Sequence, residues 1–237
     1  MQEKKFKLKL FEDCAELKEM VAAHAGGLVS GFTTNPSLMK KAGVTDYEAF
    51  ARSVLKAIPD MPISFEVFSD DFAGMEREAR KIAGWGENVY VKIPVTNTRG
   101  ESSAGLVRRL ASDGLKLNVT AILTTEQVRE VAGALSDGVP SIVSVFAGRI
   151  ADTGRDPVPY MKKAASILRP ISGAQLLWAA QRELLNIPQA EACGCHIITV
   201  KPEALRNIAL LGRELHDVSM DTVRTFHSDA KAAGFKI

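Results

Sequence analysis

Short β-branched runs alternate with helix-period segments from one end of the 237-residue chain to the other, and this alternation limits the folds available to it. Strands that alternate with helices are typical of parallel βαβ units, in which each helix returns the chain to the same edge of the sheet. Runs with strand composition occupy residues 8–13, 28–33, 63–68, 89–94, 116–121, 141–144, 175–179 and 196–200. Helix-period segments occupy residues 15–24, 47–58, 72–83, 104–113, 126–135, 158–168 and 184–193.

Eight such units in one chain of this length are what a single (β/α)8 barrel of the TIM type requires. We therefore expect one α/β barrel domain over residues 1–237. Extra C-terminal helices over 203–211 and 220–233 form a tail from about residue 203 to 237. The rival fold is a doubly wound open sheet, but no Gly-x-Gly-x-x-Gly fingerprint follows the first strand. In such barrels the active site forms at the C-terminal ends of the strands.

Composition excludes several classes of partner. A net charge of +2 without a basic stripe gives no sign of nucleic-acid binding. No apolar run approaches the roughly 20 residues that span a bilayer, and residues 1–5 lead into a strand rather than a signal-peptide core. The three cysteines are an odd number without disulfide-framework spacing, which fits a reducing compartment. We expect a soluble cytoplasmic protein.

Lys92 interrupts the apolar strand predicted at residues 89–94, where a charged side chain has no favourable place. A buried ammonium group must find a carboxylate, reach solvent or lose its charge. A neutral, desolvated lysine is a nucleophile towards carbonyl carbon and forms a Schiff base. The alternative is a side chain that extends from the strand end into water. The segment by itself does not decide between the two.

Polar side chains gather at the C-terminal ends of the other predicted strands. They are Asp13, Thr34, Asn35, Glu66, Asn118, Thr120, Ser144, Arg149 and Arg182. Each has a purely structural explanation, such as a helix cap, a strand propensity, a counter-charge for the lysine or a solvated surface charge. On one rim of a barrel, however, the set indicates a site for a polyol carbonyl compound with an anionic tail.

Cys193, Cys195 and His196 are the one cluster that could suggest a metal site. They lack a second pair of ligands elsewhere, and the other histidines are scattered along the chain. We therefore expect no metal and no cofactor.

Five segments resemble blocks of the transaldolase family, and they occur in the family's order over nearly the whole chain. They are LFEDCA at 10–15, GFTTNPS at 31–37, VKIPVT at 91–96, NVT at 118–120 and SVFAGRI at 144–150. The resemblance is to the compact, single-barrel class I type, which is related to fructose 6-phosphate aldolase. One departure is Cys14, which stands where threonine is usual.

The resemblance implies a metal-independent reaction that runs through a Schiff base. Lys92 would form it with the C2 carbonyl of a ketose phosphate, and Asp13 would remove the C4 hydroxyl proton as the C3–C4 bond breaks. Glu66 and Thr120 would hold the water that shuttles protons during imine formation. A carboxylate beside the lysine also favours its charged form, so Glu66 must be protonated or act through water.

The resemblance also implies a substrate site, made of Thr34, Asn35, Asn118, Ser144, Phe146, Arg149 and Arg182. Within it, the asparagines and the serine would bind the dihydroxyacetone unit, and the two arginines would bind the substrate phosphate, for which a forked guanidinium is suited. The family usually has a serine just before the second arginine. Here that position is Ala180, which puts the preferred sugar phosphate in doubt.

Three functions remain to be compared. In fructose 6-phosphate aldolases, glutamine stands at the position of Glu66 and tyrosine at that of Phe146, so this chain favours transfer over simple cleavage. Ala180 keeps open an enzyme of a dedicated sugar-biosynthetic pathway rather than the pentose phosphate route. A barrel that has lost catalysis and serves as a binding protein need keep neither Lys92 nor Asp13, and this chain has both.

The tail over residues 220–233 is amphipathic. It could pack on a neighbouring subunit or cover its own barrel. Because compact transaldolases resemble ring assemblies, we expect a homo-oligomer that acts on sugar-phosphate substrates.

Overall fold

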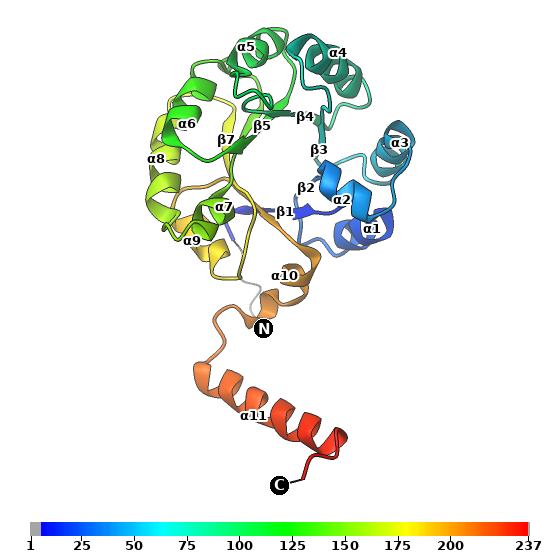
Figure 1. Ribbon diagram of the computed structural model, residues 1–237, viewed down its shortest axis with the longest axis vertical. Helices are drawn as coiled ribbons and strands as arrows, with labels where there is room; N and C mark the ends of the chain where they lie inside the picture. Colours follow the sequence, from blue (N-terminus) through cyan, green and yellow to red (C-terminus); the bar gives the residue numbers. More distant parts are fainter. Residues whose placement is uncertain (1–5, 237) are drawn as a thin grey trace.

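The computed structural model describes residues 6–236, and its eight parallel strands close into a barrel in the order β1 to β8 (Figure 1). The barrel closes because β1 pairs with β8 in parallel, with Glu12 opposite Val200. The strands are β1 (Lys9–Asp13), β2 (Gly31–Thr33), β3 (Ile63–Glu66), β4 (Val89–Pro94), β5 (Leu117–Ile122), β6 (Ser141–Val145), β7 (Ala174–Trp178) and β8 (Ile197–Val200). The predicted (β/α)8 barrel is confirmed. The prediction for residues 1–5 lies outside the described residues.

Helices surround the barrel on its outer side (Figure 1). They are α1 (Leu17–Ala25), α2 (Pro36–Lys41), α3 (Tyr47–Ala57), α4 (Phe72–Ala83), α5 (Ala104–Ser112), α6 (Thr125–Ala132), α7 (Ala147–Asp152), α8 (Val158–Leu168) and α9 (Asn186–Ala192). The short helices α2 and α7 were not predicted, because six residues are too few to show a helical period. The second strand starts three residues later than predicted, and the third ends two residues earlier.

The barrel interior and the layer outside the strands are separate apolar regions. Phe11, Leu177 and Ile197 belong to the small interior cluster, whereas Phe32 belongs to the larger layer between strands and helices. Gly31 makes room for the interior cluster, since a Cβ at this position would lie 2.6 Å from the Phe11 ring. Apolar side chains fill this part of the interior, and the polar side chains of the predicted site lie at the C-terminal ends of the strands.

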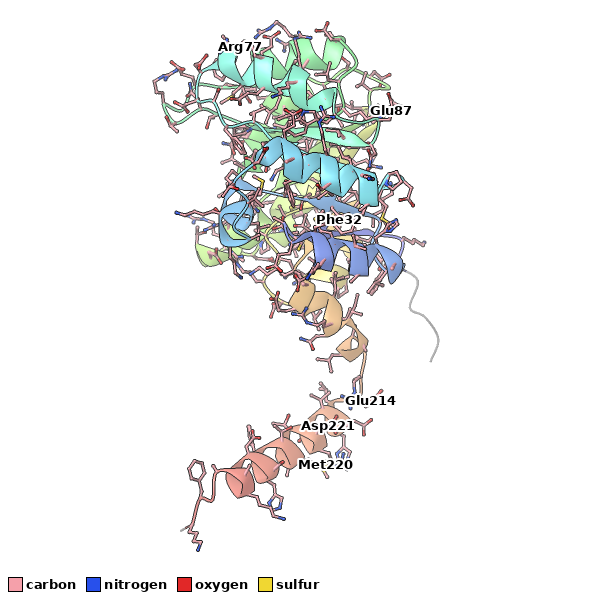
Figure 2. The ribbon with its side chains drawn as sticks, turned by 90° about the vertical axis from the view of Figure 1, so that its right-hand side faces the viewer. Phe32, Arg77, Glu87, Glu214, Met220 and Asp221 are labelled. Atoms are coloured by element: carbon pink, nitrogen blue, oxygen red, sulfur yellow. The ribbon has the colours of Figure 1, made fainter. Side chains whose placement is uncertain are left out.

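The C-terminal tail consists of α10 (Pro202–Arg206), the 3-10 helix η1 (Ile208–Leu210) and α11 (Leu215–Ala232). Helix α11 projects away from the barrel in both views, so it does not cover its own barrel (Figures 1 and 2). None of its residues is buried, and Leu215 and Phe226 are 84% and 69% exposed. No helix within residues 6–236 is long and apolar enough to cross a membrane.

Glu12 is an unexpected carboxyl group in the layer outside β1. It is only 2% exposed, and its Oε2 atom has no hydrogen-bond partner among residues 6–236. Burial, followed by the nearby charge of Glu19, raises the pKa of Glu12 to about 7, although Arg206 opposes the shift. A carboxyl group with a raised pKa favours the folded state while it is protonated. This contribution to the free energy of unfolding is fully present below the ordinary pKa of a glutamate, and it is lost as the pH rises through about 7.

We therefore expect Glu12→Gln, which stays neutral at every pH, to raise the melting temperature at pH 9 and to change it little at pH 5. Each kcal/mol gained corresponds to about 2–4 °C for a chain of this size. Thermal unfolding followed by circular dichroism at both pH values measures the effect. The exposed neighbour Glu16 provides the control, since Glu16→Gln should alter neither curve. Equal shifts at pH 5 and pH 9 would contradict the interpretation.

Candidate active site

Lys92 lies inside the barrel with its amine held by two oxygen atoms. The side chain is on β4, and the residue is 6% exposed. Its Nζ atom donates to the backbone oxygen of Thr34 at 2.8 Å and lies 3.1 Å from Glu66 Oε2. The alternative of a side chain extending into solvent is therefore wrong.

Glu66 reaches the amine because of the strand register. The parallel pairing of β3 and β4 sets Glu66 opposite Lys92, so both side chains point into the barrel from neighbouring strands. The backbone oxygen of Glu66 accepts from the Tyr47 hydroxyl at 2.9 Å, which anchors the end of β3 to α3. The contact with Lys92 is direct rather than through water. This arrangement places a carboxyl oxygen of Glu66 beside the amine.

Asp13 ends β1 at the same rim, beside the lysine. Its Oδ1 accepts from the Thr33 hydroxyl of the next strand at 2.8 Å. Burial raises the pKa of Asp13, while the charges of Lys92 and Lys201 and the Thr33 hydrogen bond oppose the shift. Glu12 of β1 is opposite Val200 of β8. Asp13 directly follows Glu12 and Lys201 directly follows Val200, so Lys201 lies next to Asp13 where the barrel closes. Because its pKa is raised, Asp13 binds a proton more readily than an ordinary aspartate does.

A buried hydrogen-bond chain links β3, β5 and β6 beside the lysine, because Asn118 is opposite Lys92 in the pairing of β4 with β5. Asn118 donates through Nδ2 to Ser64 Oγ at 3.0 Å, and its Oδ1 accepts from the Ser144 hydroxyl at 2.7 Å. These two bonds fix the orientation of the amide. Sequence reasoning missed Ser64, although it lies two residues before Glu66 and therefore shares its face of the strand.

Thr120 points into the barrel two residues after Asn118, as predicted from strand periodicity. Its hydroxyl is buried and has no partner among residues 6–236. The strand bulges immediately afterwards, with Ala121 at φ 61° and a shift in the register with β6. An unpaired buried hydroxyl is costly, so this group is suited to a bound ligand or water molecule.

Three further predicted residues lie beside this centre. Asn35 Oδ1 accepts from the backbone N–H of Leu38 at 3.0 Å, and this hydrogen bond caps α2. The Nδ2 group of Asn35 takes no part in the cap. Thr34 is fully buried, and its hydroxyl donates to the backbone oxygen of Ser64 at 3.0 Å. Phe146 is half-buried against the interior apolar cluster at the start of α7.

The two predicted phosphate-binding arginines come from adjacent segments. Arg149 lies on α7, directly after β6, and is exposed. Arg182 follows β7 and forms an ion pair with Asp152, a residue that sequence reasoning missed. Gly148 allows the two segments to meet, since a Cβ there would lie 1.6 Å from the backbone oxygen of Ala180. Ala180 itself adopts φ 61°.

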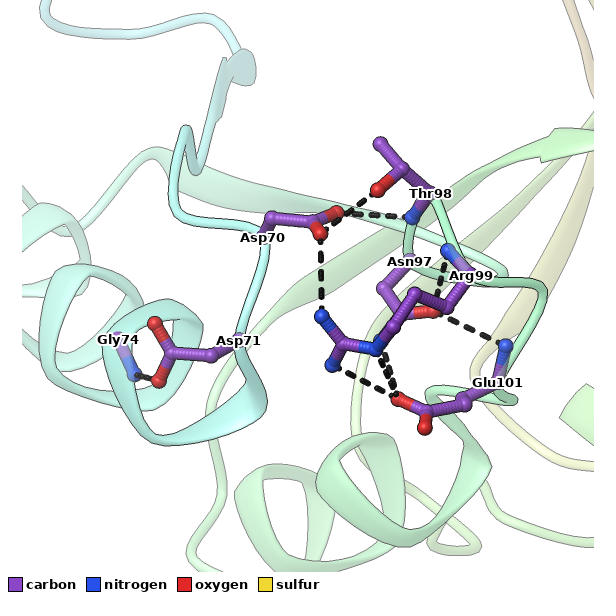
Figure 3. Close-up of polar contacts among 7 residues, drawn as sticks. All are labelled: Asp70, Asp71, Gly74, Asn97, Thr98, Arg99 and Glu101. Atoms are coloured by element: carbon purple, nitrogen blue, oxygen red, sulfur yellow. Dashed lines mark hydrogen bonds and ion pairs between the residues drawn. The ribbon is translucent and has the colours of Figure 1, made fainter.

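The loops that follow β3 and β4 are cross-linked at the rim (Figure 3). Asp70 accepts from the backbone N–H of Thr98 at 2.8 Å and from its hydroxyl at 2.7 Å. Arg99 lies 3.5 Å from Asp70 and also pairs with Glu101 at 2.9 Å. The loops next to Glu66 and Lys92 are therefore tied together, a contact between distant segments that the sequence did not indicate.

The cysteine–histidine cluster lies away from this centre. Cys193 and Cys195 are buried free thiols, and His196 Nδ1 accepts from the Leu176 amide at 3.0 Å. Across the described part of the chain, no three His, Cys, Asp or Glu side chains converge in a metal-binding arrangement.

The closed parallel barrel thus places a buried lysine and two carboxyl groups together at the C-terminal ends of its strands. The family described as transaldolase/fructose-6-phosphate aldolase matches residues 10–237. The chain belongs to this family, which implies sugar-phosphate substrates.

Relatives named as probable transaldolases are similar along most of their length. The chain is 34% identical to that of Thermoanaerobacter sp. (strain X514) over 233 residues, which cover 97% of this chain and 100% of the relative. It is 37% identical to that of Roseiflexus castenholzii (strain DSM 13941 / HLO8) over 193 residues, or 81% and 85% of the two chains. A crystal structure of dihydrodipicolinate synthase from Rhodopseudomonas palustris has a TM-score of 0.56 at 15% identity, covering 81% of this chain and 69% of that one. This last likeness supports the fold alone.

Proposed function

We propose that this protein is a transaldolase that transfers a dihydroxyacetone unit from a ketose phosphate to an aldose phosphate. The observation that carries the proposal is the buried amine of Lys92, which contacts Glu66 at 3.1 Å beside the Asp13 carboxyl group. Membership of the transaldolase/fructose-6-phosphate aldolase family supports it.

The reaction begins when the Lys92 amine, after giving a proton to Glu66, attacks the C2 carbonyl of the ketose. Loss of water yields an iminium group, and the unpaired Thr120 hydroxyl is suited to hold that water. Asp13 then accepts the C4 hydroxyl proton as the C3–C4 bond breaks. The electron pair of that bond passes to the iminium nitrogen and forms an enamine, while the aldose leaves. The enamine carbon attacks the carbonyl of the second aldose, and hydrolysis of the new imine releases the product.

The polar groups around the lysine fit a three-carbon polyol with a remote anion. Asn118 is oriented by its hydrogen bonds with Ser64 and Ser144, and we assign Asn118 and Ser144 to the dihydroxyacetone hydroxyls. Arg149 and Arg182 are the cations that we assign to the substrate phosphate. Thr34, Asn35 and Phe146 complete the proposed substrate site.

Simple aldol cleavage is the second candidate, because the family description covers both activities. Glu66 and Phe146 favour transfer over release, as argued from the sequence. Ala180 offers no hydroxyl to a phosphate, so a substrate from a dedicated sugar-biosynthetic pathway stays an alternative to one from the pentose phosphate route.

Borohydride trapping tests the Schiff base. After incubation with fructose 6-phosphate and reduction, we expect mass spectrometry to find one reduced three-carbon unit on Lys92. The variant Lys92→Met should give neither adduct nor activity. Lys116→Met is the control, because Lys116 is bonded to the backbone oxygen of Glu87 at 2.6 Å, and it should keep the adduct. An unmodified Lys92 in the active parent protein would disprove the proposal.

Transfer and release differ in their need for an acceptor. With fructose 6-phosphate as donor, we expect glyceraldehyde 3-phosphate to accumulate rapidly only when erythrose 4-phosphate is present, because the enamine otherwise has no carbonyl to attack. A coupled assay of glyceraldehyde 3-phosphate with and without the acceptor measures this. Equal rates in the two assays would assign the protein to simple cleavage instead.

We further propose that the protein forms a homo-oligomer through α11. Leu215, Val223 and Phe226 lie on one side of this helix and are all strongly exposed, whereas charged residues such as Arg224 and Lys231 lie on the other. Exposed apolar faces of this kind mark interaction surfaces. The occupant that we assign to it is a second copy of the chain.

Phe226→Asp should therefore reduce the assembly, since a charge in an apolar interface is costly to desolvate. Light scattering coupled to size-exclusion chromatography gives the mass of each variant in solution. The matched control is Ser228→Asp on the opposite side of the helix, for which we expect the parental mass. A parent protein that is monomeric, or a Phe226→Asp variant of unchanged mass, would contradict this interface.

A further inference from the structure

We propose that Asp152 is a positioning residue for the substrate phosphate, which it serves by holding one edge of the Arg182 guanidinium. The proposal rests on the transaldolase function proposed above. It adds a residue that does not itself contact substrate but determines how a phosphate-binding side chain is presented.

The contact uses only part of the guanidinium. Arg182 Nε donates to Asp152 Oδ1 at 2.8 Å, and Nη2 donates to Oδ2. A guanidinium has five N–H donors in a fixed fork, and this contact takes two of them. The two N–H groups on Nη1 and the second N–H group on Nη2 have no acceptor within residues 6–236. These donors form a second edge, and such an edge matches two oxygens of a phosphate.

The backbone on both sides of the ion pair is closely packed. The Gly148 amide donates to the Ala179 oxygen at 3.2 Å, which joins α7 to the end of β7. The Arg182 amide donates to Asn186 Oδ1 at 2.9 Å, which ties the following loop to α9. The backbone of Asp152 and Arg182 is therefore held in place on both sides. Their side-chain contact then sets the direction of the long arginine side chain.

The exposure of the pair argues for a role in binding rather than in folding. The side chains of Arg182 and Asp152 are 36% and 44% exposed, and ion pairs in water contribute little to stability. A long side chain loses rotamer freedom when it binds a ligand, and that loss weakens binding. Asp152 orders Arg182 before the substrate arrives, so this loss is smaller.

The net charge of the cluster and the side chains next to Arg182 make the orientation of its guanidinium important. The hydrogen bonds from Arg182 lower the pKa of Asp152, and the Arg149 charge lowers it further, so Asp152 is ionised at neutral pH. The cluster of Arg149, Asp152 and Arg182 keeps one net positive charge. The side chains just before Arg182 offer little to a phosphate, because Ala180 has no hydroxyl and the Gln181 amide already donates one proton to the Glu183 oxygen at 3.0 Å. The free edge of Arg182 is therefore one of the two cationic contacts that we assign to the phosphate, the other being Arg149.

The test compares two donors that differ only in the phosphate, fructose 6-phosphate and fructose, with one acceptor. For Asp152→Ala we expect kcat/KM to fall about tenfold with fructose 6-phosphate, mainly through KM, as for one weakened charge-assisted contact. With fructose we expect no change. Asp152→Glu, which restores the carboxylate, should recover part of the loss. Asp113→Asn is the control, since Asp113 is 49% exposed and pairs with Arg80 at 2.7 Å.

Two kinetic outcomes would overturn the proposal. A lower KM for fructose 6-phosphate would make Asp152 a competitor of the phosphate, and equal losses with both donors would make it a purely structural residue. Inorganic phosphate provides a readout that needs no catalysis. We expect it to raise the melting temperature of the parent protein more than that of Asp152→Ala, and equal shifts would also overturn the proposal. Borohydride trapping of Lys92 reports separately on the transaldolase function, so the two failures are distinguishable.

Discussion

The contact between Lys92 and Glu66 is the interaction on which the proposed chemistry depends, and it is a product of barrel closure. Parallel pairing of β3 and β4 sets the two residues opposite each other, and both must point inward because their neighbours pack outward against the helices. Two charges in an interior lose much of their hydration, so they need close partners. The Thr34 backbone oxygen supplies the additional acceptor for the amine.

The barrel interior is divided along its axis, and this division creates the site. Phe11, Leu177 and Ile197 fill part of the interior, which the missing side chain of Gly31 makes possible. The polar ends of the strands carry the hydrogen-bond chain through Asn118 instead. An apolar interior keeps water away, and polar groups that bond to each other keep their orientation before a substrate binds.

Charged residues at the rim connect segments that are distant in the sequence. Asp70 and Arg99 join the loops after β3 and β4, and Asp152 and Arg182 join the segments after β6 and β7. Such pairs add little to the free energy of unfolding because they are exposed, but they restrict how loops and long side chains move. Helix α11 is different, since none of its residues is buried by the rest of the described chain.

Local periodicity determined what the sequence could predict by itself. The β-branched runs between helix-period segments identified the eight strands and their order, and the interrupted strand at Lys92 marked the proposed nucleophile, because both signals lie within a few neighbouring residues. Ser64, Asp152 and the buried carboxyl of Glu12 became visible only in the tertiary structure. Their contacts depend on the register between strands and on the meeting of α7 with the end of β7. Register is set by closure of the whole barrel, and no local stretch of sequence contains that information.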